Sequence, residues 1–292
     1  MNLAMPLQLH CSEENFEKIS KTIVEDGEWH KLIVDMYYRL FEIIENLPSS
    51  DDSDYTDTLV KLRCSLRSLR YAFGTVVNIT DGCRNVVLQK QVFEQFLPIL
   101  TEELSFQRLL KVRDQLDNTI SQHLLGISSS LITIIHNFVL YYKQSISVLQ
   151  DYGMMSKARK LRESSKDSYL KTCALLIIAH LLKDDDDKEQ MKMNDGELSY
   201  LINELEKSMR KTRESGYHPE ELIEGLSRIA VIDANKLTII ENGILPLLKQ
   251  SIVADRFTPK HQEATINAIR RLAFTDESKQ KIKDQENLLA GW

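Results

Sequence analysis

The stretch 226-LSRIAVIDANKLTIIENGILPLLKQ-250 decides the fold, because its apolar helical pattern is interrupted twice. The first interruption falls at Asp233, a residue type that caps helix N-termini. The second falls at Asn242-Gly243, where glycine supplies the left-handed backbone that closes a helix. The pattern therefore predicts three successive helices separated by a capped corner and a glycine corner. Their expected ranges are 219–232, 234–241 and 244 onward.

The same pattern recurs downstream at an offset of 43 residues, where the segment from Ile223 matches the segment from Ile266. Polar positions recur together with the apolar ones, since Asp233 matches Asp276. A third copy lies upstream at 178–191, and a fourth, weaker one lies at 76–88. Periods of about 40 to 47 residues are typical of helical solenoids, in which each unit buries its core against its neighbours.

Composition favours helices throughout the chain. Its 292 residues exceed the usual size of a single compact core. They include few residues that form turns, with only 10 glycines and 6 prolines. The chain is 42% hydrophobic and 27% charged, a mixture that suits stable helices better than strands or disorder. We therefore expect an all-α fold.

Three features of the repeats resemble the armadillo repeat family. They are an apolar residue followed by alanine at a helix end (Ile229-Ala230 and Leu272-Ala273), the corner residues Asn235-Lys236, and the run 239-IIENGILPLL-248. The resemblance is specific over residues 168–292 and weaker over 56–104. It implies a right-handed superhelical solenoid of armadillo/HEAT-like repeats.

The resemblance also implies a division of the chain into three parts. Residues 1–50 are expected to form an N-terminal helical cap, and 51–165 to form degenerate armadillo-like repeats with long helices, such as one over 128–152. Residues 166–292 are expected to hold armadillo repeats, the last of them incomplete. An incomplete last unit indicates either a fragment of a longer chain or an end that a partner covers.

In the armadillo family the last helix of each unit lines a concave groove that holds an extended peptide, and the residue before the final Leu-Ala pair is typically asparagine. Here Arg228 and Arg271 occupy that place, with Glu224 and Asn267 one turn earlier, and His180 occupies it in the upstream copy. Arginine forms bidentate bonds with carboxylates, so these five residues predict a partner-binding groove for an acidic peptide or protein surface. The alternative is that they are ordinary solvent-facing helix charges.

No motif for catalysis, metal binding or cofactor binding is present in the sequence. Phosphate-binding glycine loops, nucleophile elbows and H-E-x-x-H patterns do not occur. The four cysteines lie far apart in the sequence and form no C-x-x-C motif. We therefore expect a protein that is not an enzyme, with no catalytic residue, no metal and no cofactor.

Charge and hydropathy bear on partners and location. The net charge of -6 argues against affinity for nucleic acid or anionic membranes. The most apolar runs, 131–142 and 172–182, are shorter than the ~20 residues that cross a bilayer, so no membrane insertion is expected. The N-terminus lacks the pattern of a secretion signal, which makes the cytoplasm the expected location, with the nucleus possible.

Two functions fit this pattern. The first is a non-enzymatic scaffold for protein-protein interaction that binds a peptide or protein in its concave groove. The alternative is the regulatory, autoinhibitory armadillo region of a larger signalling protein, whose effector domain of the Toll/interleukin-receptor type would lie outside this chain.

Overall fold

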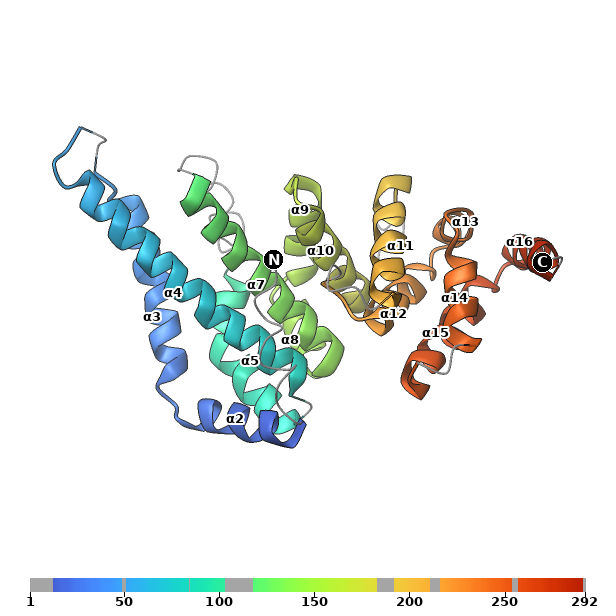
Figure 1. The fold of residues 1–292 in the computed structure, drawn as a ribbon, viewed down its shortest axis with the longest axis horizontal. Helices are drawn as coiled ribbons and strands as arrows, with labels where there is room; N and C mark the ends of the chain where they lie inside the picture. Colours follow the sequence, from blue (N-terminus) through green and yellow to red (C-terminus); the bar gives the residue numbers. More distant parts are fainter. Residues whose placement is uncertain are drawn as a thin grey trace. The chain divides into compact units, whose positions relative to one another are not determined.

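Every regular element in the described residues is a helix, which confirms the all-α prediction. The computed structural model describes residues 13–48, 51–83, 85–102, 118–182, 192–210, 216–253 and 257–290 (Figure 1). The helices are α2 (Glu13–Glu25), α3 (Trp29–Glu45), α4 (Tyr55–Gly82), α5 (Val86–Thr101), α7 (Asn118–Tyr141), α8 (Ser145–Asp151), α9 (Met154–Ser164), α10 (Ser168–Leu181), α11 (Asp195–Met209), α12 (Pro219–Ile229), α13 (Asp233–Glu241), α14 (Ile244–Val253), α15 (Pro259–Leu272) and α16 (Asp276–Ala290). Most of the predicted upstream repeat copy, at 183–191, lies outside the described residues.

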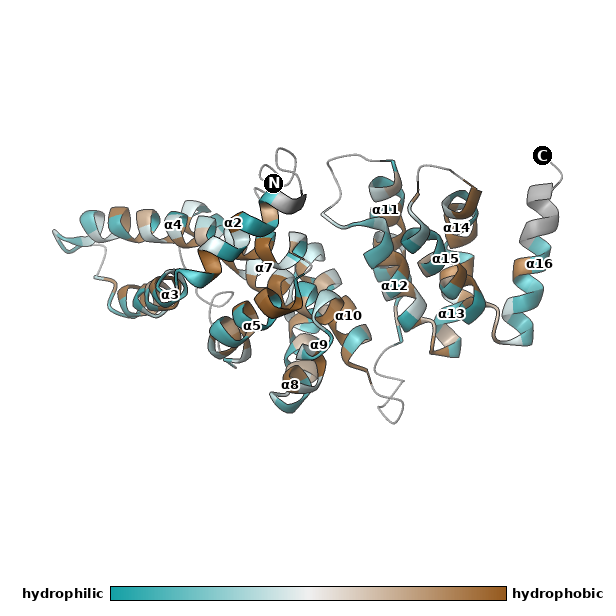
Figure 2. Ribbon diagram, turned by 90° about the horizontal axis from the view of Figure 1, so that it is seen from below, coloured by the Kyte–Doolittle hydropathy of each residue, from teal (hydrophilic) through white to brown (hydrophobic). Residues whose placement is uncertain are grey.

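The chain divides into two compact units, Met1–Ile177 and Ile178–Trp292. Helices α2 to α9 belong to the N-terminal unit and α11 to α16 to the C-terminal unit, while α10 crosses the boundary in its last turn. Along the helices of each unit, apolar stripes alternate with hydrophilic ones in Figure 2. This pattern is expected where each helix buries one face against its neighbours.

The core of the N-terminal unit is the pair of long helices α4 and α7, which lie side by side with α3 and α5 packed against them (Figure 1). Arg70 of α4 lies against Gly126 of α7, and Thr80 of α4 bonds to Asn137 of α7. The second contact lies further along both helices than the first, so α4 and α7 run in the same direction. Buried rings extend this core, since Phe73 contacts Tyr37 and Phe96 edge-on.

Helix α7 is long and apolar enough to cross a membrane by length and composition. The sequence prediction underestimated this segment, because the helix continues without a break from Asn118 to Tyr141. Its most apolar 18-residue window is 67% buried inside the protein. Burial of this extent is typical of a core helix, whose apolar residues are already covered by protein.

The predicted helix over 128–152 is wrong, because α7 ends at Tyr141 and α8 starts at Ser145. The chain turns between them through backbone bonds from Tyr142 N to Phe138 O and from Ser145 N to Tyr142 O. This turn contains neither glycine nor proline. Hydrophobic periodicity alone therefore gave no signal of it.

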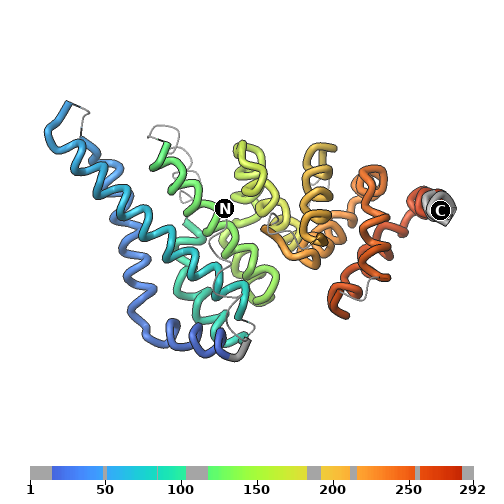
Figure 3. Tube along the Cα trace, viewed as in Figure 1, coloured from blue at the N-terminus to red at the C-terminus, as the bar shows by residue number. Residues whose placement is uncertain are grey.

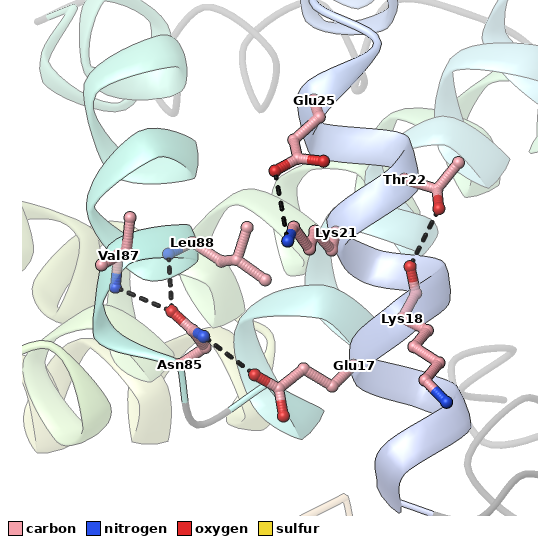
Figure 4. Close-up of polar contacts among 8 residues, drawn as sticks. All are labelled: Glu17, Lys18, Lys21, Thr22, Glu25, Asn85, Val87 and Leu88. Carbon is pink, nitrogen blue, oxygen red and sulfur yellow. Dashed lines mark hydrogen bonds and ion pairs between the residues drawn. The ribbon is translucent and has the colours of Figure 1, made fainter.

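The N-terminal helix α2 is tied to α5 through the cap of α5 (Figure 4). Asn85 Oδ1 accepts bonds from the backbone N–H groups of Val87 and Leu88 at 3.0 and 3.2 Å, and Asn85 Nδ2 donates to Glu17 Oε1 at 2.8 Å. Gln89 completes the corner, because its Nε2 donates to the backbone oxygens of Thr80 and Cys83. One N-cap side chain thus serves both its own helix and the helix beside it.

The C-terminal unit contains the helix order that the repeat predicted, with α12, α13, α14 and α15 in the expected places (Figure 3). Gly243 adopts the left-handed conformation, φ 85°, between α13 and α14 as expected. The predicted cap at Asp233 is wrong, because Ile232 holds the N-cap position and makes no side-chain cap bond. The Asp233 carboxylate instead pairs with Lys236 Nζ, three residues later in the same helix.

The corner residues Asn235 and Lys236 are both buried, and each fixes the corner in its own way. Asn235 Oδ1 accepts from the Met193 backbone N–H at 3.0 Å, and Asn235 Nδ2 donates to the Ile229 oxygen at 3.2 Å. The Lys236 ammonium lies 5.3 Å from the centre of the Phe274 ring. The polar corner of the repeat is therefore a structural joint that links α12, α13 and the segment before α11.

Candidate functional site

The predicted groove residues lie on α12 and α15, which pack against each other in the C-terminal unit. Their shared core includes Leu222 and Leu226 from α12 and Ala268 and Leu272 from α15, all buried. Burial lowers the pKa of His261 on α15, and the Glu220 carboxylate at the start of α12 opposes that shift, which indicates that the N-terminal turns of the two helices are close. The two helices therefore run in the same direction, and they carry the positions that the 43-residue sequence offset matches, such as Arg228 and Arg271.

The structure brings three of the five predicted residues together around one carboxylate. Arg228 Nη2 and Nε lie 3.1 and 3.2 Å from Glu224 Oε1, and His180 Nδ1 lies 3.9 Å from the same oxygen. The Glu224 and Arg228 side chains are 38% and 33% exposed, whereas His180 is buried. Glu224 therefore partly neutralises Arg228, a pairing that the four-residue spacing on one helix allows.

The other two predicted residues, Asn267 and Arg271, are exposed on α15. In the part of the chain that the structure describes, no ion pair involves Arg271. Arg270 lies beside it in the last turn of α15 and is also exposed. The two arginines at the matching register are thus not equivalent, because Arg228 is held by Glu224 and Arg271 faces solvent.

Two buried asparagines of the N-terminal unit, each four residues before the end of its helix, were missed from the sequence. Asn78 of α4 and Asn137 of α7 each precede the last apolar residues of their helices, and both are buried. Asn137 Nδ2 donates to Thr80 Oγ1 at 3.0 Å and lies 3.4 Å from the Val77 oxygen. The Asn137 amide is used to hold α7 against α4.

The histidine next to Asn137 is chemically silent at neutral pH. His136 is buried in α7, and its Nε2 has no hydrogen-bond partner. Burial lowers the pKa of His136 to about 4, although the nearby Asp81 carboxylate opposes this shift and Lys143 adds to it. A neutral imidazole enclosed in the core packs as an apolar group and does not reach a substrate.

Comparisons with known proteins add little to this description. No family model and no curated protein matches the chain. A solved crystal structure of an engineered protein is 17% identical in sequence, with a TM-score of 0.38, and the match covers 92% of this chain and 94% of that one. A likeness of this size carries no conclusion about fold or function.

Proposed function

We propose that this chain is a non-enzymatic scaffold of armadillo-type repeats, stacked as a right-handed superhelix, that binds a protein or peptide partner. The observation that supports it most is that α12 and α15 pack side by side in the same direction, so that side chains matched by the sequence repeat lie on neighbouring helices. An extended peptide offers side chains at regular intervals, so it suits a surface that repeats in this way.

Charge at the ends of these helices supports an acidic partner. The last turns of α12 and α15 carry Arg228, Arg270 and Arg271. Arg271 is exposed and forms no ion pair with any described residue, so its guanidinium can form two parallel bonds to a carboxylate. Arg271 is therefore the principal contact in this proposal, and Arg228 is a second contact that competes with its own Glu224.

The test is binding of labelled, extended decapeptides, measured by fluorescence anisotropy at fixed salt. Three peptides of equal length, rich in Glu/Ser, Lys/Ser and Gly/Ser, would be compared on the purified chain. We expect the Glu/Ser peptide to bind best, and we expect Arg271→Glu to weaken it about tenfold or more, as loss of a charge-assisted bond predicts.

Lys249→Glu is the matched control, because Lys249 is an exposed cation on α14 in the same unit. This variant makes the same change in net charge and should alter the affinity by about twofold or less. Circular dichroism would confirm that both variants stay folded. Equal binding of the three peptides, or equal effects of the two variants, would contradict the proposed binding face.

A further inference from the structure

A second cationic site lies in the N-terminal unit, on helices α4 and α7. Arg67 and Arg70 of α4 are three residues apart and share one side of that helix. Arg70 lies against Gly126 of α7, three residues after His123; desolvation lowers the pKa of that imidazole, and the nearby Arg70 and Arg67 guanidinium groups lower it further. Three basic side chains from two parallel helices are thus brought together.

No carboxylate balances this cluster among the described residues. Neither Arg67 nor Arg70 takes part in an ion pair within the described part of the chain, and the Arg67 guanidinium lies 5.8 Å from the Tyr71 ring centre. Helix α4 has no acidic residue between Asp57 and Asp81, and α7 has none at all. A local excess of positive charge in a chain of net charge -6 is therefore built into these two helices.

Gly126 determines where the Arg70 side chain lies. A Cβ atom at position 126 would lie 2.6 Å from Arg70 Nε and 2.9 Å from Arg70 Cδ, closer than atoms can approach. The missing side chain therefore lets Arg70 lie directly against α7, beside His123. Glycine inside a helix lowers the stability of the helix relative to alanine. At position 126 glycine is the residue that leaves room for the Arg70 side chain.

Repulsion between like charges is unfavourable, and an anion between them removes it. Planar guanidinium groups form bidentate bonds to phosphate oxygens, and an imidazole beside them can donate a third bond when protonated. Phosphate also has the compact double charge that suits two convergent guanidinium groups, whereas a single carboxylate would leave excess positive charge.

We propose that Arg67, Arg70 and His123, with Gly126 as the floor, form a binding site for a phosphate monoester. This site is independent of the peptide-binding face proposed on α12 and α15. The phosphate group can belong to a small phosphorylated molecule or to a phosphorylated side chain, and the two sources share the chemistry that the site recognises.

The test uses isothermal titration of the full chain with two probes, glycerol phosphate and a short phosphoserine peptide, each beside its unphosphorylated form. We expect at least one phosphorylated probe to bind and its unphosphorylated form not to bind. Arg70→Gln and Arg67→Gln should each weaken binding about tenfold or more, as removal of a charge-assisted bond predicts. The tighter of the two probes identifies the source.

Two further variants separate binding from structure. Lys61→Gln removes an exposed cation from another side of α4 and should change the affinity by about twofold or less. Gly126→Ala keeps every charge but displaces Arg70, so it should weaken binding without lowering the melting temperature, because alanine favours a helix more than glycine does. NMR titration should also show that bound phosphate raises the pKa of His123, a change that a merely structural role would not produce.

The proposal is overturned if neither phosphorylated probe binds the folded parent chain. It is also overturned if Arg67→Gln and Arg70→Gln bind as well as the parent, or if Lys61→Gln weakens binding as much as they do. Loss of the peptide-binding face through Arg271→Glu would leave phosphate binding unchanged, so the two proposals can fail separately.

Discussion

At the scale of single residues, Glu224 controls how much positive charge α12 presents to a partner. Its Oε1 accepts two bonds from Arg228 and lies near His180. We expect Glu224→Gln to strengthen binding of the Glu/Ser decapeptide about threefold to tenfold, because the neutral amide releases the Arg228 guanidinium and removes a repelling charge. Glu263→Gln, at an exposed position of α15, makes the same change in net charge and should have a smaller effect. Weaker peptide binding by the Glu224 variant would contradict this account.

Sequence spacing predicted part of this site. Glu224 and Arg228 lie four residues apart on one helix, so their pairing follows from the sequence alone. The approach of His180 depends on how the last turn of α10 packs on α12 within the C-terminal unit, which no local pattern encodes. The Arg67, Arg70 and His123 cluster was missed for the same reason, since α4 and α7 contact each other across more than 50 residues of sequence.

At the scale of elements, the corner between α12 and α13 depends on Asn235. We expect Asn235→Ala to lower the free energy of unfolding by about 2 to 4 kcal/mol, because it leaves the buried Met193 N–H and Ile229 oxygen without this partner. Urea unfolding followed by circular dichroism would measure the loss. Asn242→Ala is the matched control, since Asn242 also bonds through both ends of its amide but to the exposed Ser199 hydroxyl and the Thr238 oxygen. An equal loss in both variants would show that burial of the corner is unimportant.

The helices of the C-terminal unit were predictable because glycine and periodicity mark their ends. Gly243 stands where the pattern placed a helix end, and its positive φ confirms the reason. The N-cap of α13 was not predictable from residue type, because the apolar Ile232 holds it while Asp233 is the first helical residue and pairs with Lys236. The turn after Tyr141 was not predictable either, since backbone bonds alone form it. Local signals therefore identify an end only where no other partner competes for the side chain.

At the scale of the whole molecule, acid should destabilise the N-terminal compact unit, because His136 lies in its core. Its pKa is about 4 in the folded chain, against the ordinary histidine value of 6.5 expected in the unfolded chain. Above pH 6.5 the imidazole is neutral in both states and costs nothing. Between pH 6.5 and 4 the unfolded chain binds a proton that the folded chain does not. The free energy of unfolding therefore decreases as the pH is lowered through this range, by roughly 3 kcal/mol in all.

Replacement of His136 by leucine should abolish most of this acid sensitivity. Leucine fills a similar volume, and the imidazole Nε2 has no hydrogen-bond partner to lose, so stability at pH 7.5 should change by about 1 kcal/mol or less. Urea unfolding at pH 7.5 and 5.0 would be compared for the parent and the variant. His30→Leu is the control, because the pKa of His30 is also lowered by burial, but to a smaller extent in a less enclosed site. If the parent and His136→Leu lose equal stability between the two pH values, the acid-sensitive group lies elsewhere.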